Sequence, residues 1–399
     1  MMTFEEALKT TLDQWVSFGT EMICFEEAPG RVLAQPVVCD TDIPAFDKSA
    51  MDGYACRRSD LGHPLKVIEV IRAGLPPVKA VGAGECAQIM TGAEIPEGAD
   101  TVIKVEDVEN EEGVGDPGSY VRFVGSDSAN HIMYRGEDLK AGETVIAAGT
   151  RLDVRHVPIL ATAGSVSVSV ARVPSVGVLS TGTELVEPGD SPGPSQIRNT
   201  NAYQMIAQLK SLAIDADYYG IATDEFDTTR NRIGQAMSQN DIVILSGGVS
   251  MGEFDFVPDV MKSLGINIFY DKVAIQPGKP TLFGRKQNRF IFGLPGNPVS
   301  SYFTMELLVK PFIYRCMGSA GSLPVLRLPA GREIIRHKTQ RMSWIPVSIS
   351  QEGQVFPVEY HGSAHILALR DADGIVSVPI GKTAVRAGEI LEVRLLRSV

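Results

Sequence analysis

The spacing of hydrophobic and polar positions changes twice along the 399-residue chain. Residues 3–18 place apolar side chains at helical spacing, and Thr3 with Glu6 has the pattern of a capping box. A second short helix is expected over residues 25–33. Between residues 36 and 170, short apolar runs separated by Gly, Pro and Asp predict mostly antiparallel β structure, with residues 109–119 as a hairpin tip or exposed loop.

From residue 174 the apolar runs alternate with helical patterns. Strands are expected over 175–182, 215–224, 241–250, 267–275, 281–285 and 289–294. Helices are expected after residue 199, with Tyr203, Ile206, Leu209 and Leu212 on one face, and over 227–239, 254–265 and 298–317. This alternation predicts βαβ units and a parallel sheet. Residues 319–399 return to short β runs, which predict a small terminal β-barrel or sandwich.

Length and composition limit the classes of protein. A chain of this length exceeds a single core, so several domains are expected. The net charge of −11 argues against a nucleic-acid-binding protein, although it leaves room for a small anionic ligand. The five cysteines are scattered, without the clustered spacing of a zinc site. Since neither a signal peptide nor a membrane span is expected, we predict a cytoplasmic protein without a membrane partner.

The ends of the expected strands carry the residues suited to binding chemistry. In an open parallel sheet, ligands bind beyond the carboxyl ends of the strands. The segments at these ends combine Gly, Ser or Thr with an acid, a Lys or an Asn; they are residues 180–185, 222–225, 246–256, 276–280 and 293–298. Glycine lets backbone N–H groups approach a phosphate, and the following helices direct their positive ends to the same place. The sequence therefore predicts an anion pocket.

Of the carboxylates within these segments, Glu184, Asp224 and Asp255 need an explanation. They would repel an anion unless a divalent cation lay between them, and Mg²⁺ is a hard ion that shares carboxylate and phosphate oxygens. Taken singly, an acid after a strand is more often a helix cap. Lys272 and Lys279 would add positive charge, although a single loop Lys is usually only solvated.

A second polar cluster lies far away in sequence. Residues 43–55 hold Asp52, residues 90–107 hold Thr91, and residues 130–143 hold Asp138. Composition alone favours simple β-turn acids there. There is no convincing Ser-His-Asp arrangement, and the glycine-rich dinucleotide and P-loop patterns are absent.

Seven segments together resemble a known family. They are FDKSAMDGYA, MTGAEIPEGADTV, RGEDLKAGE, VLSTGTEL, SGGVSMGEFDF, QPGKP and GLPGNPVSS. They match, in order, the molybdopterin molybdotransferase family, called MoeA in bacteria and the E domain in gephyrin-like proteins. The resemblance implies a multidomain α/β plus β protein: a helical linker domain (1–42 with 139–172), an inserted β domain (43–138), a three-layer molybdopterin-binding α/β domain (173–318) and a C-terminal β-barrel (319–399).

The resemblance also implies an activity and partners. Molybdate would displace AMP from adenylyl-molybdopterin with Mg²⁺ as the cofactor, in molybdenum cofactor biosynthesis. A homodimer would bring the inserted domain of one subunit to the α/β domain of the other. Contacts with the adenylylating enzyme and with apo-molybdoenzymes are further expectations.

Site residues are carried over position by position. The resemblance implies catalytic roles for Asp52, Thr91, Asp138, Glu184, Asp224 and Asp255, the last three also as metal ligands. It implies substrate contacts at Thr181, Gly247, Gly248, Ser250, Lys272, Lys279, Pro295, Gly296, Asn297, Arg341 and Ser363.

The chain departs from the family pattern at Lys48, Gln276 and Ala368, where Asn, Lys and Ser are frequent. Either the missing Lys at 276 weakens anion binding or Lys48 compensates for it. Two other functions stay open: adenylylation of molybdopterin, which a single α/β domain performs, and a non-catalytic scaffold.

Overall fold

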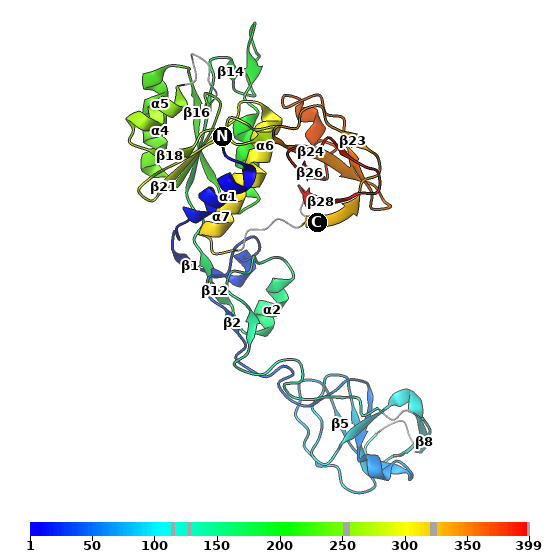
Figure 1. Cartoon of the computed structure of the whole chain (residues 1–399). Coiled ribbons are helices and arrows are strands. Elements are labelled where there is room, and N and C mark those ends of the chain that lie inside the picture. The colour runs from blue at the N-terminus through cyan, green and yellow to red at the C-terminus, as the bar shows by residue number, and fades with distance from the viewer. Residues whose placement is uncertain (113–115, 127–128, 250–255, 320–324, 397–399) are drawn as a thin grey trace. The chain divides into compact units, whose positions relative to one another are not determined.

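The computed structural model describes residues 1–112, 116–126, 129–249, 256–319 and 325–396. The chain forms two compact units. Unit 1 comprises Met1–Gln35, Ala148–Val157 and Ser167–Val399, and unit 2 comprises Pro36–Ala147 and Pro158–Val166. Figure 1 traces the elements of each unit along the chain. The finer division into four domains stays a prediction.

The N-terminal helix α1 (Phe4–Asp13) has the expected capping box. Thr3 accepts the Glu6 backbone N–H at 3.2 Å, and the Glu6 carboxylate accepts the Thr3 backbone N–H at 2.9 Å. The helix ends before residue 18, because the apolar residues that follow are used in tertiary contacts: the Arg315 guanidinium lies 4.9 Å over the Trp15 ring. The helical spacing of apolar residues therefore extends to residue 18, although the helix itself ends at Asp13.

The prediction of a second helix over 25–33 was wrong. Only a 3-10 turn, η1 (Phe25–Glu27), forms there. Val32 and Leu33 instead make β-bridges to Arg151 and Val170, so the buried apolar residues of this segment are held by extended backbone. A strand pair lies nearby, β1 (Thr20–Cys24) with β12 (Ser167–Ala171).

The largest sheet of unit 1 has six strands in the order β16-β13-β17-β21-β20-β18. Their bounds are β13 (Val176–Thr181), β16 (Ala216–Ala222), β17 (Ile242–Ser246), β18 (Asn267–Tyr270), β20 (Leu282–Lys286) and β21 (Arg289–Leu294). The first four strands in this order are parallel, as expected, but β20 pairs antiparallel with β21, and β18 pairs antiparallel with β20. The strand expected over 267–275 splits, since β19 (Ile275–Gln276) leaves to pair with the C-terminal sheet.

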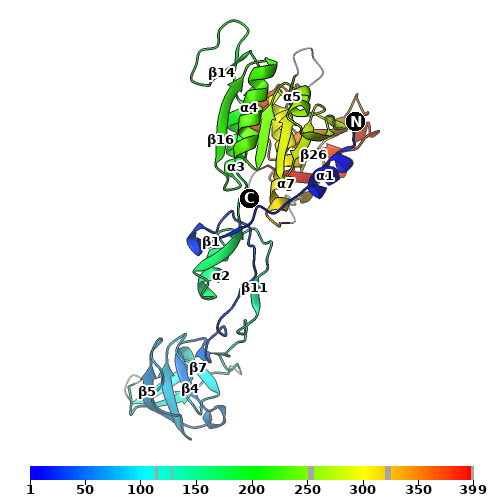
Figure 2. The ribbon, with the colours of Figure 1, turned by 90° about the vertical axis from the view of Figure 1, so that its left-hand side faces the viewer.

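Helices cover both faces of this sheet and so form three layers. They are α3 (Asn201–Lys210), α4 (Phe226–Gln239), α5 (Val257–Ser263), α6 (Pro298–Thr304), the π-helical turn η4 (Met305–Val309) and α7 (Lys310–Cys316). Val178, Ile244 and Phe292 belong to the core shared with α1, α3, α6 and α7, whereas the alternate residues Leu179 and Leu245 pack with α4 and α5. Figure 2 shows α4 and α5 beside the strands.

The buried face of α3 differs from the expected one. Ala202, Met205 and Leu209 are fully buried against the sheet, whereas Tyr203 is 44% exposed. The spacing placed Tyr203 on the apolar face, but its hydroxyl donates to the Glu187 carboxylate at 2.8 Å, away from the core. The rest of the helical pattern was predicted correctly.

The C-terminal residues form a curled, barrel-like sheet in the order β19-β24-β26-β28-β22, with β25 added to β24. The bounds are β22 (Val325–Pro329), β24 (Met342–Ile349), β25 (Val355–Pro357), β26 (Gly374–Val378) and β28 (Ile390–Leu395), and β23 (Ile334–Ile335) pairs separately with β27 (Ala384–Val385). Its interior is aliphatic, including Val347, Val376 and Val393. A 3-10 turn, η5 (Ile366–Leu369), follows the segment that carries Ser363.

Unit 2 is built on a six-stranded sheet in the order β7-β4-β6-β5-β9-β8, antiparallel except between β5 and β6. Its strands are β4 (Gly53–Cys56), β5 (Leu65–Ile71), β6 (Glu85–Ile89), β7 (Thr101–Lys104), β8 (Val108–Glu112) and β9 (Tyr120–Phe123). Short pairs join β2 (Val37–Val38) to β11 (Thr144–Ile146) and β3 (Lys48–Ser49) to β10 (Ile132–Met133). The 3-10 turns η2 (Arg58–Asp60) and η3 (Val105–Asp107) also lie here, and α2 (His156–Thr162) crosses the unit boundary. The mostly antiparallel β structure expected here is confirmed.

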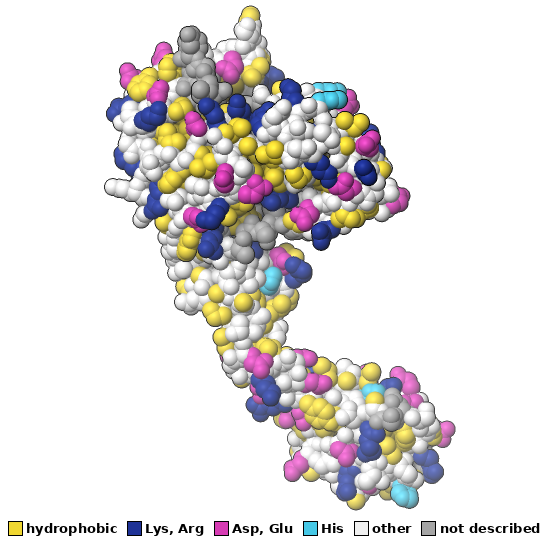
Figure 3. Space-filling view, viewed as in Figure 1, with side chains coloured by type: hydrophobic (Ala, Val, Ile, Leu, Met, Phe, Trp, Pro, Cys, Tyr) yellow, Lys and Arg dark blue, Asp and Glu magenta, His cyan; other side chains and the backbone are white. Residues whose placement is uncertain are grey.

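Within the described ranges, no helix is long and apolar enough to cross a membrane. All five cysteines are free thiols, four of them buried. Acidic and basic side chains are interspersed over the face of the molecule in Figure 3, so the net negative charge is not gathered there into one field.

Candidate functional site

A cavity of about 820 Å³ opens in unit 1 beyond the carboxyl ends of the parallel strands. The chain leaves β13 toward β16 on one side and later continues through β17 to β21 on the other, so the strand order reverses between β13 and β17. This reversal is the position where open α/β sheets bind ligands. Of the predicted site residues, the cavity is lined by Thr181, Glu184, Asp224, Gly247, Gly248, Gly296 and Asn297.

Gly247 and Gly248 form the floor of the cavity beside Thr181. Both have positive φ, at 96° and 64°, and a Cβ on Gly247 would lie 2.3 Å from the Thr181 carbonyl oxygen. Only glycine fits so close to the neighbouring strand. The Thr181 Oγ1 is buried and has no hydrogen-bond partner among the described residues, so a buried polar atom at this floor is left for a ligand or for water.

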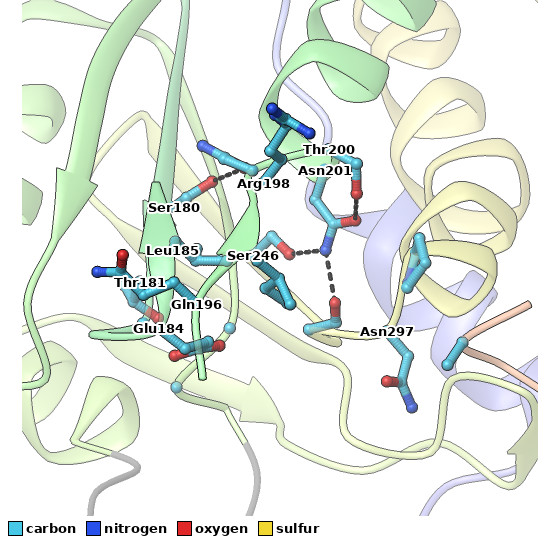
Figure 4. A pocket seen from close by; sticks show the side chains of 18 of the residues that line it. Ser180, Thr181, Glu184, Leu185, Gln196, Arg198, Thr200, Asn201, Ser246 and Asn297 are labelled. Carbon is cyan, nitrogen blue, oxygen red and sulfur yellow. Dashed lines mark hydrogen bonds between the residues drawn. The ribbon is translucent and has the colours of Figure 1, made fainter. Parts of the chain in front are cut away.

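Asn201 connects the two glycine-containing loops of the cavity. Its Nδ2 donates to the Ser246 Oγ and to the Gly296 carbonyl oxygen, both at 2.7 Å, and the Ser246 Oγ donates to the Pro295 carbonyl at 3.2 Å. Figure 4 shows the Asn201 amide between these partners. Pro295 is not among the residues that line the cavity, but its carbonyl oxygen is held by the lining residue Ser246.

Two of the three expected acids lie at the cavity. Asp224 Oδ2 accepts both the backbone N–H of Thr183, at 2.9 Å, and its hydroxyl, at 3.0 Å. The Glu184 carboxylate folds back onto Gly182, where an added Cβ would lie 2.7 Å from Oε2. Asp255 and Ser250 lie outside the described residues. Within those residues, no group of three His, Cys, Asp or Glu side chains is arranged to hold a metal ion.

The segment between β25 and β26, which includes η5, contributes one rim of the cavity. Asn297 Nδ2 donates to the Ser363 Oγ at 2.7 Å, and the neighbouring Ala364 and Ile366 line the cavity. Ser363 is thereby brought to the predicted site even though it lies 66 residues from Asn297.

The predicted basic residues are not among the lining residues. The Arg341 guanidinium donates to the Ile275 carbonyl oxygen at 3.2 Å, and Lys279 is exposed one residue before the lining residue Pro280. Lys272 is half-buried, and its carbonyl accepts the Met2 N–H. These three residues surround strand β19 and the loop after it.

In unit 2, the structure joins two of the three expected residues. Asp52 Oδ1 accepts the Thr91 backbone N–H at 2.6 Å and the Thr91 hydroxyl at 2.8 Å, and these bonds hold the pKa of Asp52 below its usual range. Asp52 is therefore ionised at neutral pH. Asp138 is exposed on the turn before β11, and its backbone N–H donates to the Ile43 carbonyl.

Several cavity residues were missed by the sequence reasoning. Arg198, Asn199 and Asn201 all belong to the segment IRNTN, which was interpreted only as a helix start. Gln196 and Ile197 precede them on the same wall. The sequence did contain a signal for these residues: two asparagines stand at the beginning of the helix that follows the first strand of the sheet. Side chains at that position face the carboxyl ends of the strands, where ligands bind.

This fold and this site define a multidomain α/β protein that binds a ligand at the topological switch point of its sheet. Three family models match the chain: the MoeA N-terminal region (domain I and II) over residues 2–164, the probable molybdopterin binding domain over 177–315, and the MoeA C-terminal region (domain IV) over 327–396. The chain belongs to the MoeA family.

Relatives and solved structures agree along the whole length. The molybdopterin molybdenumtransferase of Staphylococcus epidermidis is 32% identical, with 100% of this chain and 96% of the relative covered. That of Bacillus subtilis is 33% identical over 95% of this chain and 90% of the relative. The crystal structure of the molybdopterin biosynthesis MoeA protein from Pyrococcus horikoshii is 30% identical, covers both chains fully and has a TM-score of 0.81.

Proposed function

We propose that this protein is a molybdopterin molybdenumtransferase, which inserts molybdate into adenylyl-molybdopterin and releases AMP. One observation carries the proposal: the match to molybdenumtransferases extends over the α/β domain, unit 2 and the C-terminal sheet alike. The position of the cavity at the switch point between β13 and β17 supports it. An enzyme that only adenylylates molybdopterin would need the α/β domain alone.

The loops at the switch point hold the phosphate-bearing end of the substrate. The backbone N–H of Gly248 has no acceptor among the described residues, and Thr181 Oγ1 beside it is also unpaired. Donors fixed in this way stabilise negative charge without having to reorganise when it develops on the leaving AMP. Asn297 and Ser363 add an amide and a hydroxyl from the opposite rim.

Mg²⁺ fits the oxygen donors at this cavity. The Glu184 carboxylate and the second carboxylate oxygen of Asp224, Oδ1, accept no hydrogen bond from described residues. Mg²⁺ is commonly held by one or two carboxylates together with substrate phosphates. Asp255 is proposed as the third ligand. When bound, the ion would neutralise charge on the phosphoanhydride.

Lys272, Lys279 and Arg341 are proposed to gather the molybdate dianion. The basis is their position around β19, which joins the α/β domain to the C-terminal sheet close to the lining residue Pro280. With Gln276 in place of a further Lys, these three residues supply the fixed positive charge of this edge.

The protein is proposed to act as a homodimer in which Asp52, Thr91 and Asp138 of one protomer complete the site of the other. The ionised, hydrogen-bonded Asp52 supports this role because it is prepared for binding a cation or a donor and yet belongs to a unit separate from the cavity. Free thiols are consistent with the proposed cytoplasmic location, where the adenylylating enzyme would deliver substrate and apo-molybdoenzymes would receive the product.

Molybdate-dependent AMP release from adenylyl-molybdopterin tests the function. Glu184→Ala and Asp224→Ala should each lower this rate at least about 100-fold, because each removes charge that supports the transition state. Formation of adenylyl-molybdopterin from ATP and molybdopterin, without molybdate-dependent AMP release, would instead assign the preceding reaction.

Mixed dimers test the shared site. Asp52→Ala and Glu184→Ala proteins should each be inactive, but a heterodimer of the two retains one intact site if the residues come from different protomers. Co-expressed with a different affinity tag on each chain and purified through both tags, the heterodimer should recover roughly half of the wild-type rate per dimer, because one of the two sites of a two-fold dimer stays intact. No recovery would place both residues in one protomer's site.

A further inference from the structure

One wall of the cavity is formed by an arm, residues 185–198, which contains β14 (Leu185–Val186) and β15 (Ile197–Arg198). Leu185, Pro192, Gln196, Ile197 and Arg198 all line the cavity. Figures 1 and 2 show this arm, near the label β14, extending beyond the body of the α/β domain. The arm therefore contributes apolar surface and one guanidinium to ligand contact.

The arm has little support of its own. Every residue from 188 to 198 is exposed. Its hydrogen bonds are local: the Ile197 N–H donates to the Glu184 carbonyl, the Asn199 N–H to the Val186 carbonyl, and the Arg198 side-chain Nε to the Pro188 carbonyl. An exposed segment with only local hydrogen bonds opens at low free-energy cost. A wall that holds ligand needs an additional anchor.

That anchor is Glu187 at the base of the arm. The Tyr203 hydroxyl donates to its Oε2 at 2.8 Å, and the Tyr218 hydroxyl donates to its Oε1 at 2.7 Å. Tyr203 belongs to α3 and Tyr218 to β16, with ring centroids 5.7 Å apart. Two hydroxyls from two different elements thus grip both oxygens of one carboxylate, and bonds to a charged acceptor are about twice as strong as neutral ones.

The grip is connected to the cavity floor. Asn199 Nδ2 donates to the Tyr218 hydroxyl at 2.9 Å, which directs the Tyr218 proton toward Glu187. Asn199 Oδ1 accepts from the Ser180 hydroxyl at 3.0 Å, and Ser180 lines the cavity. Burial and then the Glu187 contact raise the pKa of the Tyr218 hydroxyl, so it stays protonated and remains a donor at physiological pH.

We propose that Glu187, Tyr203 and Tyr218 are positioning residues that lock the arm against the sheet and thereby set the affinity of the cavity for its nucleotide-linked pterin substrate. This inference rests on the proposed function for the identity of the substrate. None of the three residues is proposed to touch the reacting atoms.

The test removes both hydroxyls in Tyr203→Phe/Tyr218→Phe. The KM for adenylyl-molybdopterin should rise about three- to ten-fold, which corresponds to losing part of a charge-assisted hydrogen bond. The kcat should stay within about two-fold, because a wall that contacts the ground state and the transition state equally affects KM alone. A fall in kcat with unchanged KM would overturn the proposal.

Tyr219→Phe is the matched control. Tyr219 is the next residue on β16, and its hydroxyl bonds to Gln239 and Asn240 on the other face of the sheet. Like Tyr218→Phe, this variant removes a tyrosine hydroxyl from β16. It should therefore reproduce a general loss of stability while leaving the contacts of the arm unchanged. Equal changes in KM for the control and for the double variant would assign the effect to general destabilisation and refute the lock.

Hydrogen–deuterium exchange of peptides covering residues 185–198 tests whether these three residues hold the arm in place, and it requires no activity measurement. Exchange should accelerate in the double variant and in Glu187→Ala, but not in Tyr219→Phe. Once Glu187 is Ala, removing the two hydroxyls should add little, because the three groups act as one unit. Unchanged arm exchange would sink the lock even if the enzyme is active; absence of AMP release by the wild type would sink the proposed function alone.

Discussion

Gly247→Ala tests the close contact between Gly247 and Thr181 at the floor of the cavity. The residue has φ of 96°, and its new Cβ would lie 2.3 Å from the carbonyl oxygen of Thr181 on the neighbouring strand. The backbone conformation alone costs an L-residue about 1–2 kcal/mol. The overlap adds about 1–3 kcal/mol, because β13 and β17 are fully buried parallel neighbours and cannot separate freely. Because Ala has less conformational entropy than Gly in the unfolded chain, about 0.4–1 kcal/mol of this destabilisation is offset.

The expected net loss of unfolding free energy is therefore about 1–5 kcal/mol, of which about 1–3 kcal/mol comes from the overlap. Gly265→Ala is the matched control: it has φ of 70° in the same domain, but no atom lies within 4 Å of its added Cβ. Its loss should stay at about 1 kcal/mol or less. Urea unfolding of both variants can be followed by Trp fluorescence, since Trp15 and Trp344 both belong to unit 1. If the two variants lose equal stability, the tight contact at Thr181 is not what fixes glycine at 247.

Three further predictions concern single contacts. Asn201→Leu leaves the buried groups of both cavity loops without a donor, so it should cost about 2–4 kcal/mol in urea unfolding and weaken substrate binding in calorimetry; unchanged affinity would show that the loops hold themselves. Lys310→Met leaves the buried Glu306 carboxylate without its cationic partner at 2.6 Å, with only the neutral Gln208 amide donating to it, and should cost about 3–5 kcal/mol. Adding Glu306→Leu should restore part of the loss, because the buried charge is gone but Gln208 Nε2 loses its 2.6 Å acceptor; a single variant as stable as wild type would contradict this. The pKa of Asp42 is lowered from 3.8, first by the hydrogen bond from the Ala141 N–H. The ionised carboxylate therefore contributes stability to the folded state above pH 3.8, and this contribution is lost as the pH falls further. The melting temperature of Asp42→Asn should accordingly depend less steeply on pH below about 4 than that of wild type.

Local signals in the sequence determined most of the secondary structure. The Thr3–Glu6 pair marked the start of α1, and the apolar runs marked β13, β16, β17 and β21 with their intervening helices. These features depend on neighbours in sequence, which is why spacing predicts them. The segments rich in Gly, Ser and Thr at the strand ends likewise pointed to the cavity edge.

Pairing partners and contacts between distant segments could not be predicted in this way. Nothing local distinguishes β20 from a parallel strand, or shows that β19 pairs with the C-terminal sheet, since strand direction is decided by the connections and by the partner. The same holds for Asn201, whose importance comes from a backbone carbonyl at Gly296, 95 residues away.

By itself, the sequence determined the order of elements, the family and the kinds of side chain available for binding. The tertiary structure decided which of them meet: Thr181 beside Gly247, Asn297 with Ser363, and Glu187 between two tyrosines. The reason is physical, because periodicity records which face of an element is buried, while the partner of a buried polar atom is selected only when separate segments pack together.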